Sequence, residues 1–139
     1  MNRFAACLIC LATVSALVGT GCATKPVTHT VTSANNGSTV NLATGDFLVV
    51  QLESNPSTGY TWQTMDLNSW VIAATKRPNF ATSGATNAEG QHLMGAPGTL
   101  TLSFRAVGSG TSPLKLAYLR HWETNAEAGK TFNLTVVVK

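Results

Sequence analysis

The residue types that most often perform chemistry are few in this 139-residue chain, and their spacing matches no familiar active or metal site. Its three histidines, His29, His92 and His121, are widely separated. Its six acidic residues have the spacing neither of a calcium-binding EF-hand loop nor of a His-Glu-x-x-His zinc site. No Gly-x-Ser-x-Gly segment marks a serine hydrolase, although a Ser-His-Asp group assembled only by folding would leave no such sign. We expect a protein that is not an enzyme and that uses no metal ion and no cofactor.

The positions of the cysteines exclude further kinds of chemical site. Cys7, Cys10 and Cys22 all lie in the first 22 residues, so the rest of the chain has none. A disulfide, a thiolate zinc site and a cysteine nucleophile are therefore excluded from the folded part.

The N-terminus has the organisation of an export signal. Arg3 precedes an almost unbroken apolar run over residues 4–18, which is shorter than the ~20 residues that a membrane-spanning helix needs. Residues 17–22 resemble the processing box of a bacterial lipoprotein, in which the final cysteine receives lipid. We expect residues 1–21 to be a signal peptide and Cys22 to be the lipid attachment site. A plain signal peptide cut near Ala23 is the alternative.

This reading predicts where the protein resides. Several acyl chains on Cys22 give a stable membrane anchor, because each buried methylene contributes ~0.8 kcal/mol. Ala23, rather than an aspartate, follows the cysteine, which favours an outer-membrane lipoprotein in the cell envelope or periplasm. Residues 22–32 are expected to form the lipidated N-terminus and a tether.

The composition favours a single folded domain over residues 33–139. Only 11% of residues are charged and 44% are hydrophobic, so a packed core is expected. The net charge of +3 comes without any run of lysine or arginine, so nucleic-acid binding is excluded. Short β-type segments separated by turn residues predict a β-sandwich of about seven strands. The segments are 39–42, 47–52, 61–63, 70–74, 99–106, 114–119 and 132–138, with a loop expected over 80–91.

Between the second and third of these segments lies the sequence Asn55-Pro56-Ser57-Thr58-Gly59-Tyr60. Pro56 fixes its own φ and restricts the residue before it, and Gly59 tolerates a positive φ. The short polar side chains can bond the loop backbone locally. A stiff, protruding loop with a small, neutral tip is predicted, and it suits insertion into a groove because little entropy is lost on docking. An ordinary turn between two strands is the alternative.

Two further segments flank strands at similar positions. Gly95-Ala96-Pro97-Gly98 precedes the alternating strand 99–106, and Arg120-His121-Trp122 ends the strand 114–119. A large aromatic residue beside a cation is a common binding anchor. The alternative for Trp122 is that it caps the core of the sandwich.

In order and spacing, these three segments resemble the three loop motifs of the chagasin-type inhibitors of cysteine peptidases. The pattern of that family is Asn-Pro-Thr-Thr-Gly-Tyr/Phe, then Gly-x-Gly-Gly, then Arg-Pro-Trp/Phe. The resemblance extends from about Gly45 to the C-terminus and includes the Leu-x-Tyr-x-Arg lead-in of residues 116–120. Two positions differ from the pattern: Pro97 replaces a glycine and His121 replaces a proline.

The resemblance implies an immunoglobulin-like β-sandwich, expected here as a monomer, with the three loops at one end. It implies a reversible, tight-binding inhibitor of papain-like cysteine peptidases. The loop with Thr58 would enter the active-site cleft as a wedge, and residues 95–98 and 120–122 would flank it. The alternative function is an immunoglobulin-like envelope lipoprotein that binds another protein or a glycan.

Overall fold

The computed structural model describes residues 25–82, 88, 95, 97–123 and 127–139. These residues form nine strands and two short 3₁₀ turns, η1 (Ser33–Asn35) and η2 (Pro56–Thr58). The strands are β1 (Thr28–Thr32), β2 (Thr39–Leu42), β3 (Phe47–Ser54), β4 (Thr61–Leu67), β5 (Ile72–Ala74), β6 (Asn79–Thr82), β7 (Gly98–Ala106), β8 (Gly110–Leu119) and β9 (Lys130–Val138).

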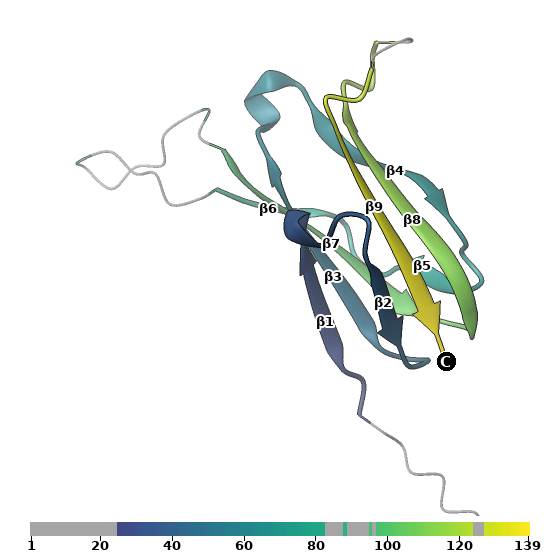
Figure 1. The fold of residues 1–139 in the computed structure, drawn as a ribbon. Helices are drawn as coiled ribbons and strands as arrows, with labels where there is room; N and C mark the ends of the chain where they lie inside the picture. The colour runs from purple at the N-terminus through teal and green to yellow at the C-terminus, as the bar shows by residue number, and fades with distance from the viewer. Residues whose placement is uncertain (1–24, 83–87, 89–94, 96, 124–126) are drawn as a thin grey trace, which may run out of the picture.

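The strands build two sheets that pack face to face (Figure 1). The first sheet has the order β1-β3-β7-β5, with β6 also paired to β7, and the second has the order β2-β9-β8-β4. β1 pairs with β3, and β2 with β9, in parallel, whereas the other pairs are antiparallel. The predicted all-β sandwich is confirmed.

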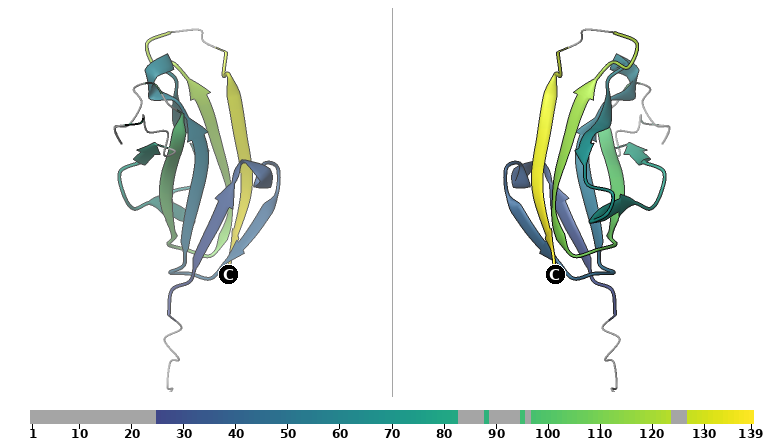
Figure 2. Two further views of the ribbon diagram at one scale, coloured as in Figure 1. Left: turned by 90° about the vertical axis from the view of Figure 1, so that its left-hand side faces the viewer. Right: turned by 90° about the vertical axis from the view of Figure 1, so that its right-hand side faces the viewer.

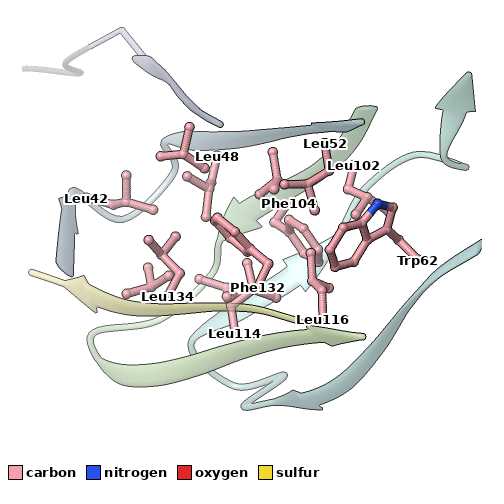
Figure 3. Packing of buried hydrophobic residues seen from close by; sticks show 14 of the residues in the cluster. Leu42, Leu48, Leu52, Trp62, Leu102, Phe104, Leu114, Leu116, Phe132 and Leu134 are labelled. Atoms are coloured by element: carbon pink, nitrogen blue, oxygen red, sulfur yellow. The ribbon is translucent and has the colours of Figure 1, made fainter. Parts of the chain in front are cut away.

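The core fills the space between the sheets (Figure 3). Along β3 and β7 every second side chain is buried, which is the alternation expected of strands with one face on a core. Burial of a large apolar side chain contributes roughly 1.5–3 kcal/mol, so this set is the main source of stability. Its largest fully buried apolar members are Phe104, Phe132, Leu48, Leu52, Ile72, Leu114, Leu116, Val50 and Val136.

Two strands lie where the sequence predicts other structure. Residues 28–32, placed in the tether, form β1, which pairs with β3 and buries Val31. Residues 79–82, the last three of which fall in the predicted loop 80–91, form β6 on β7. Both segments are short and polar, and both pair with the backbone of a longer strand, which requires no apolar pattern of their own.

Some predictions concern residues outside the described part of the chain. These are the signal peptide (1–21), the lipid site Cys22, most of the loop after Thr82, and Ala96. Within the described residues, no helix is long and apolar enough to cross a membrane.

The sandwich has two distinct ends (Figure 2). β3 runs from Phe47, which pairs with Arg105, to Ser54, which pairs with Gly98. We call the end beyond Ser54 the loop pole; its described residues are 55–60, 95, 97 and 120–123. We call the end before Phe47 the tail pole; it comprises residues 25–27, 43–46, 68–71, 107–109 and Lys139. The chain enters at the tail pole and also ends there.

Candidate functional site

The first predicted loop, residues 55–60, connects β3 to β4 at the loop pole and contains the turn η2. Pro56 occupies the start of this turn, where its missing N–H costs nothing. Pro56, Ser57 and Thr58 are exposed, so they form the tip. Gly59 ends the turn with φ +77°, a conformation that other L-residues adopt only with strain.

Polar side chains stiffen this loop from within. The Asn55 Oδ1 atom accepts hydrogen bonds from the Ser57 hydroxyl at 2.6 Å and the Ser57 N–H at 3.2 Å. The Thr58 hydroxyl donates to the Asn55 carbonyl oxygen at 2.7 Å. The predicted local bonding is present, and the loop is an ordered projection.

Residues of β8 and its extension hold the loop to the sandwich. The Asn55 N–H donates to the Tyr118 hydroxyl at 2.9 Å. Arg120 Nε donates to the Thr58 carbonyl oxygen at 3.2 Å, and the Arg120 guanidinium lies 4.5 Å from the centre of the Tyr60 ring. The Tyr60 ring stacks on Tyr118, with 5.3 Å between the ring centres. The first and third predicted loops are therefore one connected structure.

The third loop, residues 120–122, presents an aromatic surface beside the first. The Trp122 side chain is 57% exposed, so it does not cap the core. The edge of its indole lies against Gly59: a Cβ atom at residue 59 would come within 2.3 Å of Trp122 Cη2. His121 is exposed and meets Trp122 edge-on, with 4.8 Å between ring centres.

Arg120 is held in place from both sides. One guanidinium nitrogen bonds the Glu123 carboxylate at 3.0 Å. This hydrogen bond raises the pKa of Arg120 above its already high ordinary value, so the guanidinium stays charged.

Among its described residues, the second predicted loop has two exposed residues, Gly95 and Pro97, and one buried residue, Gly98. Gly95 (φ +86°) accepts a hydrogen bond from Asn55 Nδ2 at its carbonyl oxygen, at 3.2 Å, so it lies beside the first loop. Pro97 is exposed. Gly98 is instead the first residue of β7 and is buried. A Cβ atom there would lie 2.4 Å from the Ala81 carbonyl oxygen of β6, so this glycine permits close strand packing.

A shallow hollow of about 370 Å³ lies between the first and third loops. Apolar side chains from the sheet edge and both loops form most of its wall, including Pro56, Tyr60, Phe80, Leu100 and Trp122. Such a surface can accept an apolar side chain of a partner protein.

Among the described residues, no three metal-ligating side chains lie together. His29 pairs with Asp46 at 3.4 Å, but this pair lies at the tail pole. The groups gathered at the loop pole can bind a surface and exclude water from it.

Two positioning residues were absent from the predicted site. Tyr118 anchors Asn55, and Glu123 orients Arg120. Tyr118 follows the inward alternation of Leu114 and Leu116, which could have identified it as buried, but its bond to a residue 63 positions away has no sign in the sequence.

Comparison with known proteins gives a consistent result. A family model described as "Chagasin family peptidase inhibitor I42" matches residues 41–136. Chagasin of Trypanosoma cruzi is 30% identical over 112 residues, covering 78% of this chain and 96% of chagasin. Amoebiasin-2 of Entamoeba histolytica is 28% identical, covering 80% of this chain and 85% of that protein.

Solved structures show the same fold. The crystal structure of the cysteine protease inhibitor EhICP2 from Entamoeba histolytica superposes with a TM-score of 0.69 at 24% identity, covering 81% of this chain and 96% of that one. The structure of PbICP-C in complex with falcipain-2 gives a TM-score of 0.55 at 19% identity, covering 81% and 99%.

Proposed function

Since this chain belongs to the chagasin family of peptidase inhibitors, we propose that it inhibits papain-like cysteine peptidases by filling their active-site cleft with the loop pole. The family consists of inhibitors rather than enzymes, which agrees with the expectation from the sequence. The observation that carries the proposal is the joining of three chain segments by Asn55 and Arg120 into one exposed, ordered surface.

In this proposal the tip of the first loop is the wedge. Pro56, Ser57 and Thr58 are exposed, and their backbone is already fixed by Asn55 and Gly59, so docking costs little conformational entropy. A rigid turn occupies the cleft without placing a peptide bond in line with the catalytic cysteine. Inhibition is then reversible and needs neither a cofactor nor a covalent step.

The flanking segments contact the two rims of the cleft. Trp122 and Arg120 supply an aromatic surface and a fixed cation, which are residue types common in binding hot spots. On the other side, Gly95 brings its backbone next to the wedge, while Pro97 offers no N–H for main-chain pairing. Gly98 contributes by packing β6 on β7 rather than by contact with the peptidase.

The test is a titration of papain with the protein, using a fluorogenic substrate. Thr58→Arg should weaken inhibition strongly, because a long charged side chain at the tip cannot enter the cleft, while the melting temperature stays nearly unchanged. The matched control is Thr111→Arg, at an exposed position of β8 near the tail pole, which should inhibit normally.

Two outcomes would contradict the proposed function or the proposed role of the wedge. Absence of inhibition at micromolar protein would reject the proposed function. Equal inhibition by the Thr58→Arg variant and the unchanged protein would reject the wedge. The alternative role, an envelope lipoprotein that binds another protein or a glycan, has no support in the comparisons.

We also propose that the inhibitor acts in the cell envelope. The support is the export signal over residues 1–21 and the lipoprotein-like segment that ends at Cys22, which together favour an outer-membrane lipoprotein. Acylated Cys22 in the membrane fraction, measured by mass spectrometry, is the expected result; an unmodified, secreted product would contradict it.

A further inference from the structure

The exposed apolar side chains are unevenly distributed over the molecule. Five large ones are exposed among the described residues: Val27, Met65, Trp70, Val107 and Trp122. Trp122 belongs to the loop pole, and the proposed function explains its exposure. Val27, Trp70 and Val107 all lie at the tail pole, far from the proposed inhibitory surface, and nothing in that function explains them.

These three residues form a row across the end of the first sheet. The Phe47 N–H donates to the Val27 carbonyl oxygen at 2.8 Å, and the Ala106 N–H to the Asp46 carbonyl oxygen at 2.9 Å. The Val107 N–H then donates to the Val71 carbonyl oxygen at 2.9 Å, which places Trp70 next to the β7–β8 turn. The row therefore follows the strand order β1, β3, β7 and β5.

Trp70 is the most exposed of them, at 84%, yet its backbone is firmly held. The Asn68 side chain accepts a hydrogen bond from the Trp70 N–H at 3.1 Å. Asn68 in turn donates its own N–H to the Ser112 hydroxyl, which is buried. An ordered turn thus presents an indole to solvent, where it is available to a partner surface. Tryptophan is the side chain most suited to a membrane–water interface, because its ring is apolar and its N–H is polar.

In the described part of the chain, cations without an ion pair are most numerous at the tail pole. Toward the loop pole and in the middle, Lys130, Arg120 and Lys115 each form an ion pair with a carboxylate. Lys76 and Arg77, between β5 and β6, form none among the described residues. Lys25, Arg105 and Lys139, at or next to the tail pole, form no ion pair with a carboxylate among the described residues.

The acids at this end offset only part of this charge. Asp46 is buried and bonded by two backbone N–H groups, but its carboxylate still carries one negative charge. Even with the terminal carboxylate of Lys139 counted, the three cations exceed the two acids, so this end remains positive. A positive surface beside exposed apolar groups is attracted to anionic lipid.

The chain between Cys22 and the tail pole is short, and this indicates that a membrane is the surface that covers the tail pole. Lys25 begins the described chain at this pole, and Cys22 lies three residues earlier. Three residues span at most about 10 Å, so lipid on Cys22 would hold the tail pole against the bilayer. We propose that the tail pole docks on an anionic membrane surface with Trp70 at the interface, so that the loop pole faces away from the membrane. This inference rests on the membrane anchoring proposed above and not on the peptidase target.

The experiment uses the mature, lipidated protein (residues 22–139) reconstituted in vesicles of phosphatidylcholine and phosphatidylglycerol whose acyl chains carry bromine, which quenches nearby tryptophan fluorescence. Trp122→Phe should leave the quenching intact, and Trp70→Phe should remove most of it. These variants are a matched pair, since each removes one exposed indole from one pole and leaves the buried Trp62 in place. Vesicles without phosphatidylglycerol should quench Trp70 less.

Quenching that survives Trp70→Phe, or that is lost with Trp122→Phe, would overturn the proposal. Equal quenching with and without phosphatidylglycerol would overturn the assignment of an anionic surface. Papain inhibition is measured on the same vesicles and should be unchanged by Trp70→Phe. Lost inhibition in the unchanged protein with intact quenching would reject the peptidase proposal alone, whereas the reverse result would reject only the docking.

Discussion

Trp122 lies against Gly59, so two of the proposed binding loops meet at this position. The indole edge occupies the space that a side chain at residue 59 would need, and the positive φ of Gly59 closes the turn that presents Thr58. Gly59 therefore determines both the shape of the wedge and the position of Trp122. Matched control variants can separate the effect of a substitution at Trp122 or Gly59 on binding from its effect on stability.

Trp122→Ala should weaken peptidase inhibition by about 2 kcal/mol, roughly thirtyfold, because a half-exposed aromatic anchor is removed. The inhibition constant measures this, and thermal unfolding should change little. Trp70→Ala removes an exposed tryptophan from the opposite pole and serves as the control, with no expected effect on inhibition. An unchanged inhibition constant for Trp122→Ala would remove this residue from the binding surface.

Gly59→Ala should destabilise the protein by about 1–2 kcal/mol from the left-handed backbone alone, and by more because the new methyl group displaces Trp122. Gly37→Ala is the control, since Gly37 has a similar φ of +80° but nothing within 4 Å of a new Cβ atom. Chemical denaturation measures both. In a Trp122→Ala background the cost of Gly59→Ala should fall to that of Gly37→Ala; an unaltered cost would show that the contact does not matter.

At the scale of elements, β8 connects the core to the loop pole. Its inner face carries Leu114 and Leu116 into the core, and the same alternation then brings the Tyr118 ring between Tyr60 and Trp62. The Tyr118 hydroxyl ends this row under the start of the first loop. The rigidity of the loop therefore depends on a strand that is distant in sequence.

Tyr118→Phe should test this dependence. It leaves the stacked ring but removes the partner of the Asn55 N–H, which costs roughly 1–3 kcal/mol when a partly buried donor is left unpaired. We expect lower stability in denaturant and weaker inhibition together, because the wedge becomes less ordered. Tyr60→Phe, which keeps the ring beneath Arg120, is the control. Full inhibition by Tyr118→Phe would show that the loop is held without this bond.

At the scale of the whole molecule, the two poles differ in structure. The loop pole carries an exposed tip without charged side chains. At the tail pole, hydrogen bonds to the Asp46 carboxylate connect the segment before β1 with the β2–β3 turn at the start of β3. The Val27 and Ala43 N–H groups each donate to its carboxylate at 2.9 Å. These bonds, with a smaller contribution from His29, lower the pKa of Asp46 below its ordinary value of 3.8.

This arrangement predicts how stability depends on pH. A carboxylate whose pKa is lowered by folding contributes stability that is complete above its ordinary pKa and is lost as the pH falls through the folded value. We expect Asp46→Asn to lower the melting temperature at neutral pH and to flatten its decline below pH 3.8. Asp66→Asn, which breaks only the exposed pair with Lys115, should do neither. Identical pH profiles for Asp46→Asn and the unchanged protein would refute the role of Asp46.

The sequence by itself determined the class of fold and the positions of the turns that we propose as binding loops. Alternating segments such as 99–106 have one stable solution, a strand with one face on a core, and this follows from local periodicity. Pro56 and Gly59 constrain their own backbone, so the turn could be predicted from residue types alone.

Only the tertiary structure decided which residues serve these loops and which merely border them. Gly98 has a loop-like sequence context but lies buried because β6 packs on it, while Tyr118, a strand residue, supports the wedge. β1 and β6 form because an adjacent strand offers free backbone groups, a condition that lies outside their own sequences. The separation of the two poles has the same origin: pairing between distant strands sets which turns meet, and no local pattern records that pairing.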